Sequence, residues 1–220
     1  MSVALLVACY LLGSIPWGLL VVRWRHGVDV RTYGSGSTGT TNVLRTAGGK
    51  VAVLVFLMDA AKGAVAVVLA HLVTDNSWLI AGAALAALIG HIWPVFAKFR
   101  GGRGVATGEG SLLALMPIAA GFTWLPVAGL LVWVPFVPVL LFTRYMSLAS
   151  IMAVATAAIA LAILSLTGFY PTGYLLYAVV GGVLIIFGHR ANLKRLMEGK
   201  ELKLGQRKLL DTAGGPGSAR

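Results

Sequence analysis

Long apolar segments alternate with short polar ones along the chain. Most of them approach the ~20 residues that an α-helix needs to cross the ~30 Å hydrocarbon core of a membrane. Of all residues, 58% are hydrophobic and only 11% are charged, whereas a soluble domain has about 25% charged residues. The sequence therefore predicts an all-α integral membrane protein and excludes a soluble enzyme. The apolar segments are residues 3–22, 51–73, 79–96, 112–142, 151–166 and 174–187.

The basic residues determine the orientation that we expect in the membrane. Five of them lie between the first two apolar segments, and Lys98, Arg100 and Arg103 follow the third. Because Lys and Arg gather in cytoplasmic loops, both loops should face the cytoplasm and the N-terminus should lie outside. Residues 74–78 contain no Lys or Arg and belong outside. The net charge of +11 follows from this rule, so we expect no nucleic-acid partner.

The fourth apolar segment is too long for one crossing. Its 31 residues would form a helix of about 46 Å, and one crossing would leave the basic C-terminal segment outside. Helix breakers divide it into residues 112–122 and 125–142. We expect about seven transmembrane helices and a cytoplasmic C-terminus, with residues 1–204 as one transmembrane domain and 205–220 as a disordered tail. The breakers are Pro117, Gly121, Pro126 and Gly129.

Two opposite charges lie inside the second apolar segment. Asp59 and Lys62 are three residues apart and share one face of the expected helix. A charge at this depth in a membrane points to a functional site. A mutually neutralised pair that joins helices is the structural alternative, and the sequence leaves both open.

The first basic loop has the composition of a phosphate-binding loop. Its glycines allow backbone N–H groups to converge on an anion, its hydroxyls add donors, and a following helix adds its positive dipole end. An arginine can bind phosphate through two parallel hydrogen bonds. The lysine of a Walker loop is absent, which excludes an NTPase, and a flexible linker is the structural alternative. The candidates are Gly34, Ser35, Gly36, Ser37, Thr41, Asn42 and Arg45.

A second basic, glycine-rich turn precedes the fourth apolar segment and is a candidate for a second anion site. Its basic residues also satisfy the rule for membrane orientation. His91 with Pro94 can simply end a helix, so a purely structural role stays open. The candidate residues are Gly101, Gly102, Arg103, Gly104 and Thr107.

A third candidate segment follows the last apolar segment. His189 and Asn192 are three residues apart and share one helix face if the helix continues. An imidazole at this position can accept a proton from a hydroxyl, whereas an interfacial histidine ahead of a basic amphipathic tail is the alternative. Ser147 and Ser150 lie in a short hinge and can donate further hydrogen bonds to an anion.

Several catalytic patterns are absent from the sequence. The seven acidic residues are dispersed, so paired carboxylates at metal-ligand spacing are missing and we expect no metal or cofactor. A GxSxG nucleophile elbow is missing too. The three loops should instead meet at one membrane face beside apolar helices. The substrates should then bring together phosphate and a long hydrocarbon chain.

Four motifs occur in order along nearly the whole chain. They are GSIPWG at residues 13–18, GSGSTGTTNVLR at 34–45, GHIWPVFAKFRGGRGVAT at 90–107 and HRANLKRLMEGKE at 189–201. Together they resemble the motifs of the bacterial acyl-phosphate-dependent glycerol-3-phosphate acyltransferases, which are membrane-integral enzymes. The resemblance implies seven helices, a bacterial inner-membrane location, an active site at the cytoplasmic face and no obligatory protein partner.

The resemblance also implies the reaction. A fatty acyl group would pass from acyl phosphate to the 1-hydroxyl of glycerol 3-phosphate, which gives lysophosphatidic acid and phosphate in the first step of phospholipid synthesis. Direct attack without an acyl-enzyme is the expected mechanism, with His189 or a substrate phosphate oxygen as the base. A covalent role for Ser35 is less favoured. A membrane transporter or exchanger for a phosphorylated metabolite is the alternative function.

Individual residues match active-site positions of this family. Ser35 and Arg45 match positions that contact glycerol 3-phosphate, and Arg103 stands where the family has a lysine. Arg103 keeps the charge but presents it as a forked donor. In the first loop, Ser37 replaces Asn and Thr40 replaces Ala, and both remain small and polar. Further matches to polar active-site positions are Ser147, His189 and Asn192.

Overall fold

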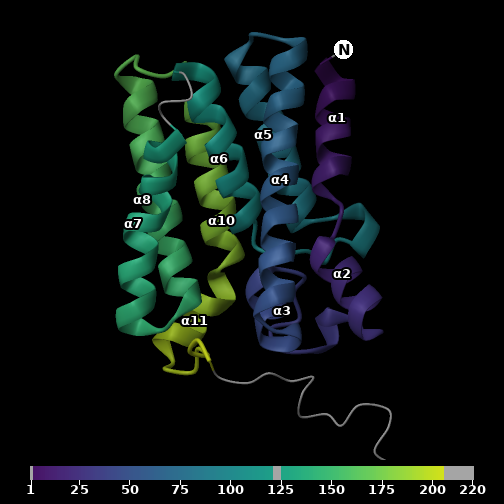
Figure 1. Ribbon diagram of the computed structural model, residues 1–220. Coiled ribbons are helices and arrows are strands. Elements are labelled where there is room, and N and C mark those ends of the chain that lie inside the picture. Colours follow the sequence, from purple (N-terminus) through teal and green to yellow (C-terminus); the bar gives the residue numbers. More distant parts are fainter. Residues whose placement is uncertain (1, 121–124, 206–220) are drawn as a thin grey trace, which may run out of the picture.

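The structure of the protein is a computed structural model that describes residues 2–120 and 125–205. These residues form helices and connecting turns, without a β-strand among them. Long helices run beside one another, and α2, α3 and α11 lie at the end of the molecule opposite the N-terminus (Figure 1). The helices are α1 (Ser2–Gly13), α2 (Trp17–His26), α3 (Thr40–Ala47), α4 (Gly49–Val73), α5 (Ser77–Ile92), α6 (Val105–Ala120), α7 (Leu125–Thr143), α8 (Met146–Leu166), α9 (Tyr174–Leu176), α10 (Gly182–Gly188) and α11 (Arg190–Met197), with short turns η1 (Val30–Thr32), η2 (Val95–Ala97) and η4 (Tyr177–Gly181).

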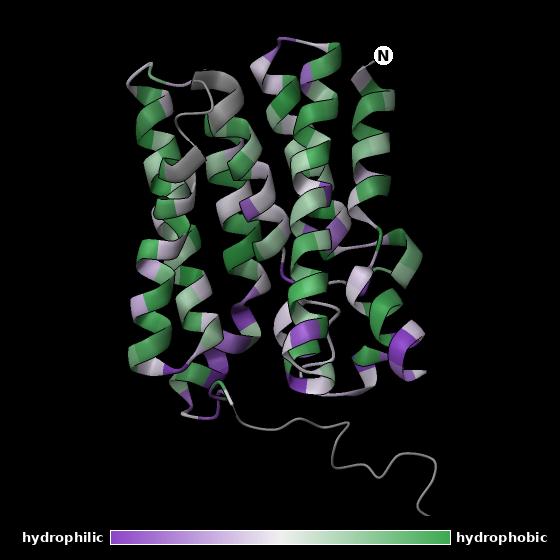
Figure 2. Ribbon diagram, in the orientation of Figure 1, coloured by the Kyte–Doolittle hydropathy of each residue, from purple (hydrophilic) through white to green (hydrophobic). Residues whose placement is uncertain are grey.

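The helices have the length and composition of a multi-pass membrane protein. Among the described residues, four stretches are long and apolar enough to cross a membrane, and the number becomes five when the bent pair formed by the α9–α10 segment and α11 counts as one span. Shorter apolar helices lie within α6 and α7. Hydrophilic residues gather at the end that carries α2, α3 and α11 (Figure 2). The four stretches are Ser2–His26, Gly49–Val73, Ser77–Ala97 and Met146–Leu166.

The apolar segments of the sequence correspond to helices, with one difference. The predicted continuous helix over residues 3–22 is interrupted between Gly13 and Trp17, where Pro16 lacks the N–H of a regular helix. The fourth apolar segment forms two helices, α6 and α7, as its breakers predict. Of those breakers, Gly121 lies outside the described residues. The predicted disordered tail also lies outside them from residue 206 onward.

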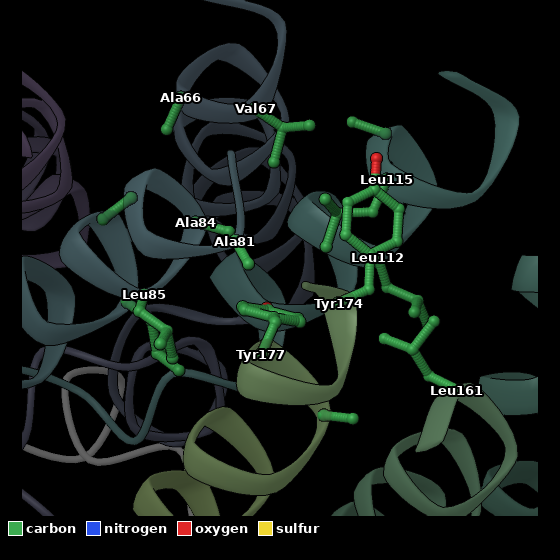
Figure 3. Close-up of a cluster of buried hydrophobic side chains, with 14 of the residues drawn as sticks. Ala66, Val67, Ala81, Ala84, Leu85, Leu112, Leu115, Leu161, Tyr174 and Tyr177 are labelled. Atoms are coloured by element: carbon green, nitrogen blue, oxygen red, sulfur yellow. The ribbon is translucent and has the colours of Figure 1, made fainter. Parts of the chain in front are cut away.

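The largest buried cluster packs α5, α6, α8 and the α9–α10 segment against one another. Tyr174 and Tyr177 lie among leucines of α6 and α8, and alanines of α5 face the same cluster (Figure 3). The Tyr177 hydroxyl donates a hydrogen bond of 3.0 Å to the Gly108 carbonyl on α6, so this buried polar group is satisfied. The cluster therefore fixes α6 relative to α10.

Glycines allow the backbones of α4 and α6 to meet. A Cβ on Gly63 of α4 would overlap the Thr107 carbonyl, and a Cβ on Gly110 of α6 would overlap the Ala60 carbonyl. The α1–α5 crossing is built in the same way. Lipid is as apolar as the side chains, so close contact between small residues is a main source of helix association in a membrane. The two crossings thus fix α4 relative to α6 and α1 relative to α5.

We predict that Gly110→Ala destabilises the protein because the new methyl group would push α6 away from the Ala60 carbonyl. Overpacking of this kind costs about 1–3 kcal/mol. Gly82→Ala on α5 is the matched control, since its Cβ would meet only the flexible end of Leu6 at 3.4 Å. Thermal unfolding of both variants in one detergent measures the difference. Equal melting temperatures would contradict a close α4–α6 crossing.

Candidate functional site

A cavity of about 330 Å³ lies where the first loop, α4, the α5–α6 loop, α7, α8 and the end of α10 meet. One part of its wall is apolar and includes Val53 and Phe56 of α4 and Val132, Trp133 and Phe136 of α7. The other part is polar and basic. The polar lining residues are Ser37, Thr40, Thr41, His91, Arg103, Glu109, Ser150 and His189.

Four helices begin at this cavity. Thr40 of α3, Gly49 of α4, Val105 of α6 and Met146 of α8 each lie in the first turn of their helix, and each lines the cavity. The first N–H groups of a helix have no partner within the helix, and they carry the positive end of its dipole. An arrangement of four such ends favours an anion strongly.

The first loop is organised from within by Asn42. Its side-chain amide donates to the carbonyls of Val30, Tyr33 and Ser37 at 2.8–3.1 Å, and its oxygen accepts from the Ser35 N–H at 2.8 Å. The side chain is 1% exposed and its hydrogen-bonding capacity is used inside the loop. These hydrogen bonds shape the first loop from within, and a contact between the Asn42 side chain and an anion stays a prediction.

Glycine is required at one position of this loop. Gly34 has a φ of +56°, a left-handed conformation that disfavours other residues, and a Cβ there would overlap the Asn42 oxygen. The adjoining Ser35 hydroxyl lies 3.2 Å from the Ser37 hydroxyl. Ser37 lines the cavity, so the two hydroxyls form a short chain that ends there.

The second loop is strained and firmly held. Lys98 and Phe99 adopt left-handed φ values of 56° and 59°, which cost of order 1–3 kcal/mol each for residues other than glycine. The Phe99 N–H donates to the Pro94 carbonyl at 2.8 Å, and the Arg31 guanidinium donates to the Ala97 carbonyl at 2.9 Å. Strained backbone that the surroundings hold in place is typical of functional loops.

Cations surround the polar part of the site and share one acidic neighbour. Burial lowers the pKa of Arg103 to about 10 and also lowers the pKa of Arg45, while the negative charge of Glu201 offsets part of both shifts. Both guanidinium groups stay charged at neutral pH. Burial deprives these charges of water, so an anionic ligand would gain more from them than from exposed arginines.

Glu201 connects the third segment to α8. Its carboxylate accepts hydrogen bonds from the Ser147 hydroxyl at 2.9 Å, the Asn192 amide at 2.6 Å and the Arg195 guanidinium at 2.7 Å. Burial alone would raise its pKa, but these three donors outweigh burial and lower it. The sequence did not identify Glu201, because Ser147 lies 54 residues away along the chain.

The segment that contains Glu201 also contacts Arg45. The Arg45 guanidinium donates to the carbonyl of the next residue, Leu202, at 3.0 Å. Residues of the first loop, α8, α11 and the segment after α11 are thus joined around one carboxylate.

His189 presents one ring nitrogen to the cavity. Its Nδ1 lies 2.8 Å from the Ile185 carbonyl, which only accepts hydrogen bonds, so Nδ1 carries the proton in the neutral ring. Nε2 then has the free lone pair. The residue is 1% exposed and lines the cavity beside Arg103. An unprotonated Nε2 can accept a proton from a hydroxyl that binds within hydrogen-bond reach.

The candidate residues from the sequence divide into two groups. Those that line the cavity are Ser37, Thr41, Arg103, Gly104 and His189. The others do not line it: Gly34, Ser35, Gly36, Gly101 and Gly102 lie in the two loops, and Asn42, Arg45, Thr107, Ser147 and Asn192 lie in α3, α6, α8 and α11. Among these, the Thr107 hydroxyl and the Asn192 side-chain oxygen are buried without a hydrogen-bond partner. Ser147 and Ser150 belong to α8 and not to the predicted hinge, because the helix already begins at Met146.

The apolar wall and one further acid were missed by motif reasoning. Phe56 and Trp133 form an edge-to-face pair with ring centroids 6.4 Å apart, and both residues lie in apolar segments where composition alone indicates only lipid or core contacts. Glu109 lines this cavity and also a smaller apolar one of about 50 Å³ beside it. In the described residues, His, Cys, Asp and Glu do not gather in a group of three or more that would hold a metal ion.

The fold and the site define a multi-pass helical membrane protein with a cavity whose wall is polar and basic in one part and apolar in the other. The sequence profile of the family described as Glycerol-3-phosphate acyltransferase matches residues 3–199. The chain therefore belongs to the glycerol-3-phosphate acyltransferase family.

Relatives of this family are similar over nearly their whole length. Glycerol-3-phosphate acyltransferase 3 of Dehalococcoides mccartyi strain CBDB1 is 45% identical, with 91% of this chain and 94% of the relative covered. The glycerol-3-phosphate acyltransferase of Rubrobacter xylanophilus is 43% identical, with 94% and 97% covered.

Solved structures agree with this assignment. A crystal structure of PlsY, an integral membrane glycerol 3-phosphate acyltransferase, in the glycerol 3-phosphate form has a TM-score of 0.81 at 39% identity, with 93% of this chain and 96% of that chain covered. The lysophosphatidic acid form has a TM-score of 0.79 at 38% identity, with 93% and 95% covered.

We predict that Glu201→Gln destabilises the folded protein at neutral pH. The folded-state pKa of Glu201 is lowered, so its ionised form stabilises the fold above the ordinary carboxyl pKa of about 4.3. This contribution disappears as the pH falls through the lower folded-state pKa. Loss of charged hydrogen bonds in a buried group costs about 1–3 kcal/mol. Unfolding measured from pH 7 down to pH 3 should show the two proteins converging in acid.

Glu198→Gln is the matched control on the same segment. Glu198 pairs with the exposed Lys194 and Lys200, at 3.9 and 3.2 Å, and exposed pairs contribute about 0–1 kcal/mol. Equal losses in the two variants would show that Glu201 has no special structural role.

Proposed function

We propose that this protein transfers a fatty acyl group from acyl phosphate to the 1-hydroxyl of glycerol 3-phosphate. The products are lysophosphatidic acid and inorganic phosphate. The observation that carries the proposal is the convergence of four helix N-termini and the half-buried Arg103 on a cavity whose remaining wall is apolar, with the buried Arg45 beside it. Both proposed substrates are phosphate monoanions or dianions, and one also bears a long hydrocarbon chain. Family membership supports the acceptor.

The polar and apolar walls suit different parts of the two substrates. The N-terminal turns of α3, α4, α6 and α8 supply donors for phosphate oxygens, and Arg103 and Arg45 supply charge. The wall formed by α4 and α7 suits an acyl chain. Acyl phosphate carries a good leaving group, so binding and orientation supply much of the required rate enhancement.

In the proposed reaction, the 1-hydroxyl oxygen of glycerol 3-phosphate attacks the acyl carbonyl carbon. The new ester C–O bond forms, the bond from that carbon to the phosphate oxygen breaks, and inorganic phosphate leaves. The hydroxyl proton passes to Nε2 of His189 or to a phosphate oxygen of the substrate. Backbone N–H groups at the helix starts stabilise the developing oxyanion.

The roles of the remaining candidates follow from their positions. Ser35 and Ser37 form the hydroxyl chain that ends at the cavity. The hydroxyl of Ser35 pairs with another serine and not with a base, which favours phosphate binding over covalent catalysis by Ser35. Asn192 and Ser147 are held by Glu201. The unpartnered Asn192 oxygen and Thr107 hydroxyl are further contacts for a bound substrate.

We also propose that the chain crosses a bacterial inner membrane seven times, with the N-terminus outside and the site at the cytoplasmic face. The four long spans, the bent pair and the shorter helices α6 and α7 together supply seven crossings. The positive-inside rule supports the orientation. The cavity is lined by α3 and by the first turns of α4 and α8, and hydrophilic residues gather at the end of the bundle that carries α3 (Figure 2). Transporters bind their substrates near the midplane, so a transporter is the less supported alternative.

We predict that purified protein in lipid releases inorganic phosphate from palmitoyl phosphate only when glycerol 3-phosphate is present, with lysophosphatidic acid formed in equal amount. Arg103→Ala should lower kcat/KM about 100-fold, because a buried charge-assisted contact to phosphate is lost. Arg100→Ala is the matched control, since this arginine of the same loop is exposed.

The outcomes separate the alternatives. Product formation from palmitoyl-CoA but not from palmitoyl phosphate would contradict the proposed donor. Folded protein that forms no product from either donor would favour the transporter. An acyl label that stays on the denatured protein would replace direct attack with an acyl-enzyme.

The proposed orientation predicts which introduced cysteines react from outside. Asp75→Cys lies in the exposed α4–α5 turn, and Lys200→Cys lies after α11 with a side chain 73% exposed. In a Cys9→Ser background, a membrane-impermeant maleimide should label position 75 in intact spheroplasts and position 200 only after lysis. The opposite pattern would reverse the orientation.

A further inference from the structure

A charged network lies buried between α4 and α5, below the second loop. Lys62 Nζ lies 2.8 Å from Asp59 Oδ1, and His91 Nδ1 lies 3.4 Å from the same oxygen. The three side chains are between 2% and 5% exposed. Charges removed from water in apolar helices are costly, even as a pair. An apolar pair would serve α4 equally well if helix packing were the only purpose.

The network is in direct contact with the second loop. The Gly102 N–H donates to the His91 carbonyl at 3.2 Å. A Cβ on Gly102 would overlap Nε2 of the His91 ring, and a Cβ on Gly101 would overlap the His91 carbonyl. The backbone of Gly102 therefore lies directly against the imidazole ring of His91. The next residue along the loop is Arg103, which lines the cavity together with His91.

The network also reaches the first loop through the break between α1 and α2. Lys62 Nζ donates a hydrogen bond of 2.9 Å to the carbonyl of Ile15, which lies in that break. In α2, a Cβ on Gly18 would overlap the carbonyl of Thr38 in the first loop. The Thr38 N–H in turn donates to the Gly101 carbonyl at 3.4 Å. Both loops thus contact segments that are linked to the same ion pair. The second loop contacts His91, and the first loop contacts α2, which follows the Ile15 carbonyl that Lys62 binds.

The charges of the network favour a fixed imidazole. A carboxylate only accepts hydrogen bonds, so the neutral ring keeps its proton on Nδ1, toward Asp59. Lys62 neutralises the charge of Asp59, so the pair does not require His91 to be protonated. The ring lies between Asp59, at 3.4 Å from Nδ1, and Gly102, which its Nε2 edge faces.

We propose that Asp59, Lys62 and His91 are positioning residues that hold the second loop, Lys98–Gly104, in a strained conformation that suits phosphate binding. The inference rests on the proposed function for its kinetic test, and it also predicts phosphate binding in the absence of turnover. The loop carries the left-handed Lys98 and Phe99, a conformation that persists only when its surroundings enforce it. The His91 imidazole, which faces Gly102, is one of the groups that hold this conformation.

The test compares His91→Leu with His91→Asn. The leucine variant loses both the contact with Asp59 and the polar edge against Gly102, whereas asparagine retains a donor near the position of Nδ1. We expect His91→Leu to raise KM for at least one phosphorylated substrate about tenfold or more, with His91→Asn recovering most of that loss. His71→Leu, at an exposed site on α4, is the control and should change neither constant.

A role limited to folding gives a different result. A smaller folded fraction lowers the apparent kcat and leaves every KM unchanged, and that outcome in His91→Leu would overturn the proposal. The second readout is the rise in melting temperature of the detergent-solubilised protein in inorganic phosphate. His91→Leu should lose most of this rise, and a full rise would also overturn the proposal.

The two readouts keep the inference separate from the proposed function. If the wild-type protein shows phosphate protection but transfers no acyl group from any donor, the proposed reaction fails while the phosphate readout still tests the positioning role. The paired variant Asp59→Asn with Lys62→Met adds an independent measurement. It removes both charges together, so it should fold better than either single variant and yet keep a raised KM.

Discussion

The proposed substrates are anions that must be bound at the edge of an apolar helix bundle without a matching excess of charged side chains. Backbone N–H groups at helix starts meet this need, because they carry positive charge and cost no burial of an ion. Four helices begin around the cavity, and each start is preceded by a loop or break that turns the chain back. The glycine contacts between α4 and α6 and between α1 and α5 let these starts converge.

The formal charges at the site are few and coupled. Arg45 and Arg103 share Glu201 as their acidic neighbour, and that carboxylate is already occupied by Ser147, Asn192 and Arg195. The cavity therefore keeps a positive excess that substrate phosphate can neutralise. Because Glu201 also fixes the polar groups of α8 and α11, the same carboxylate limits the electrostatic cost of the cations and orients their neighbours.

Sequence reasoning succeeded where local pattern determines structure. Apolar runs predicted the helices, and the breakers separated α6 from α7. The glycine loops proved to surround one cavity. It failed where distant residues meet, as for Glu201 with Ser147 and for the apolar wall between α4 and α7. Residue type did not reveal the structural role of Asn42, because an amide inside a glycine loop suits an anion and the loop's own carbonyls equally well.

The buried ion pair of Asp59 and Lys62 meets two requirements of the molecule. It must be neutral inside an apolar helix, and it contacts the segments next to the two loops. The sequence left open whether Asp59 and Lys62 neutralise each other or serve a site, and their surroundings unite the two readings. The pair satisfies its own charge at 2.8 Å, which makes it tolerable in an apolar helix. It also contacts the break after α1 through Ile15 and the second loop through His91. The strained backbone of the second loop, at Lys98 and Phe99, persists only when its surroundings hold it. An ion pair in a medium of low dielectric is strong enough to contribute to that hold.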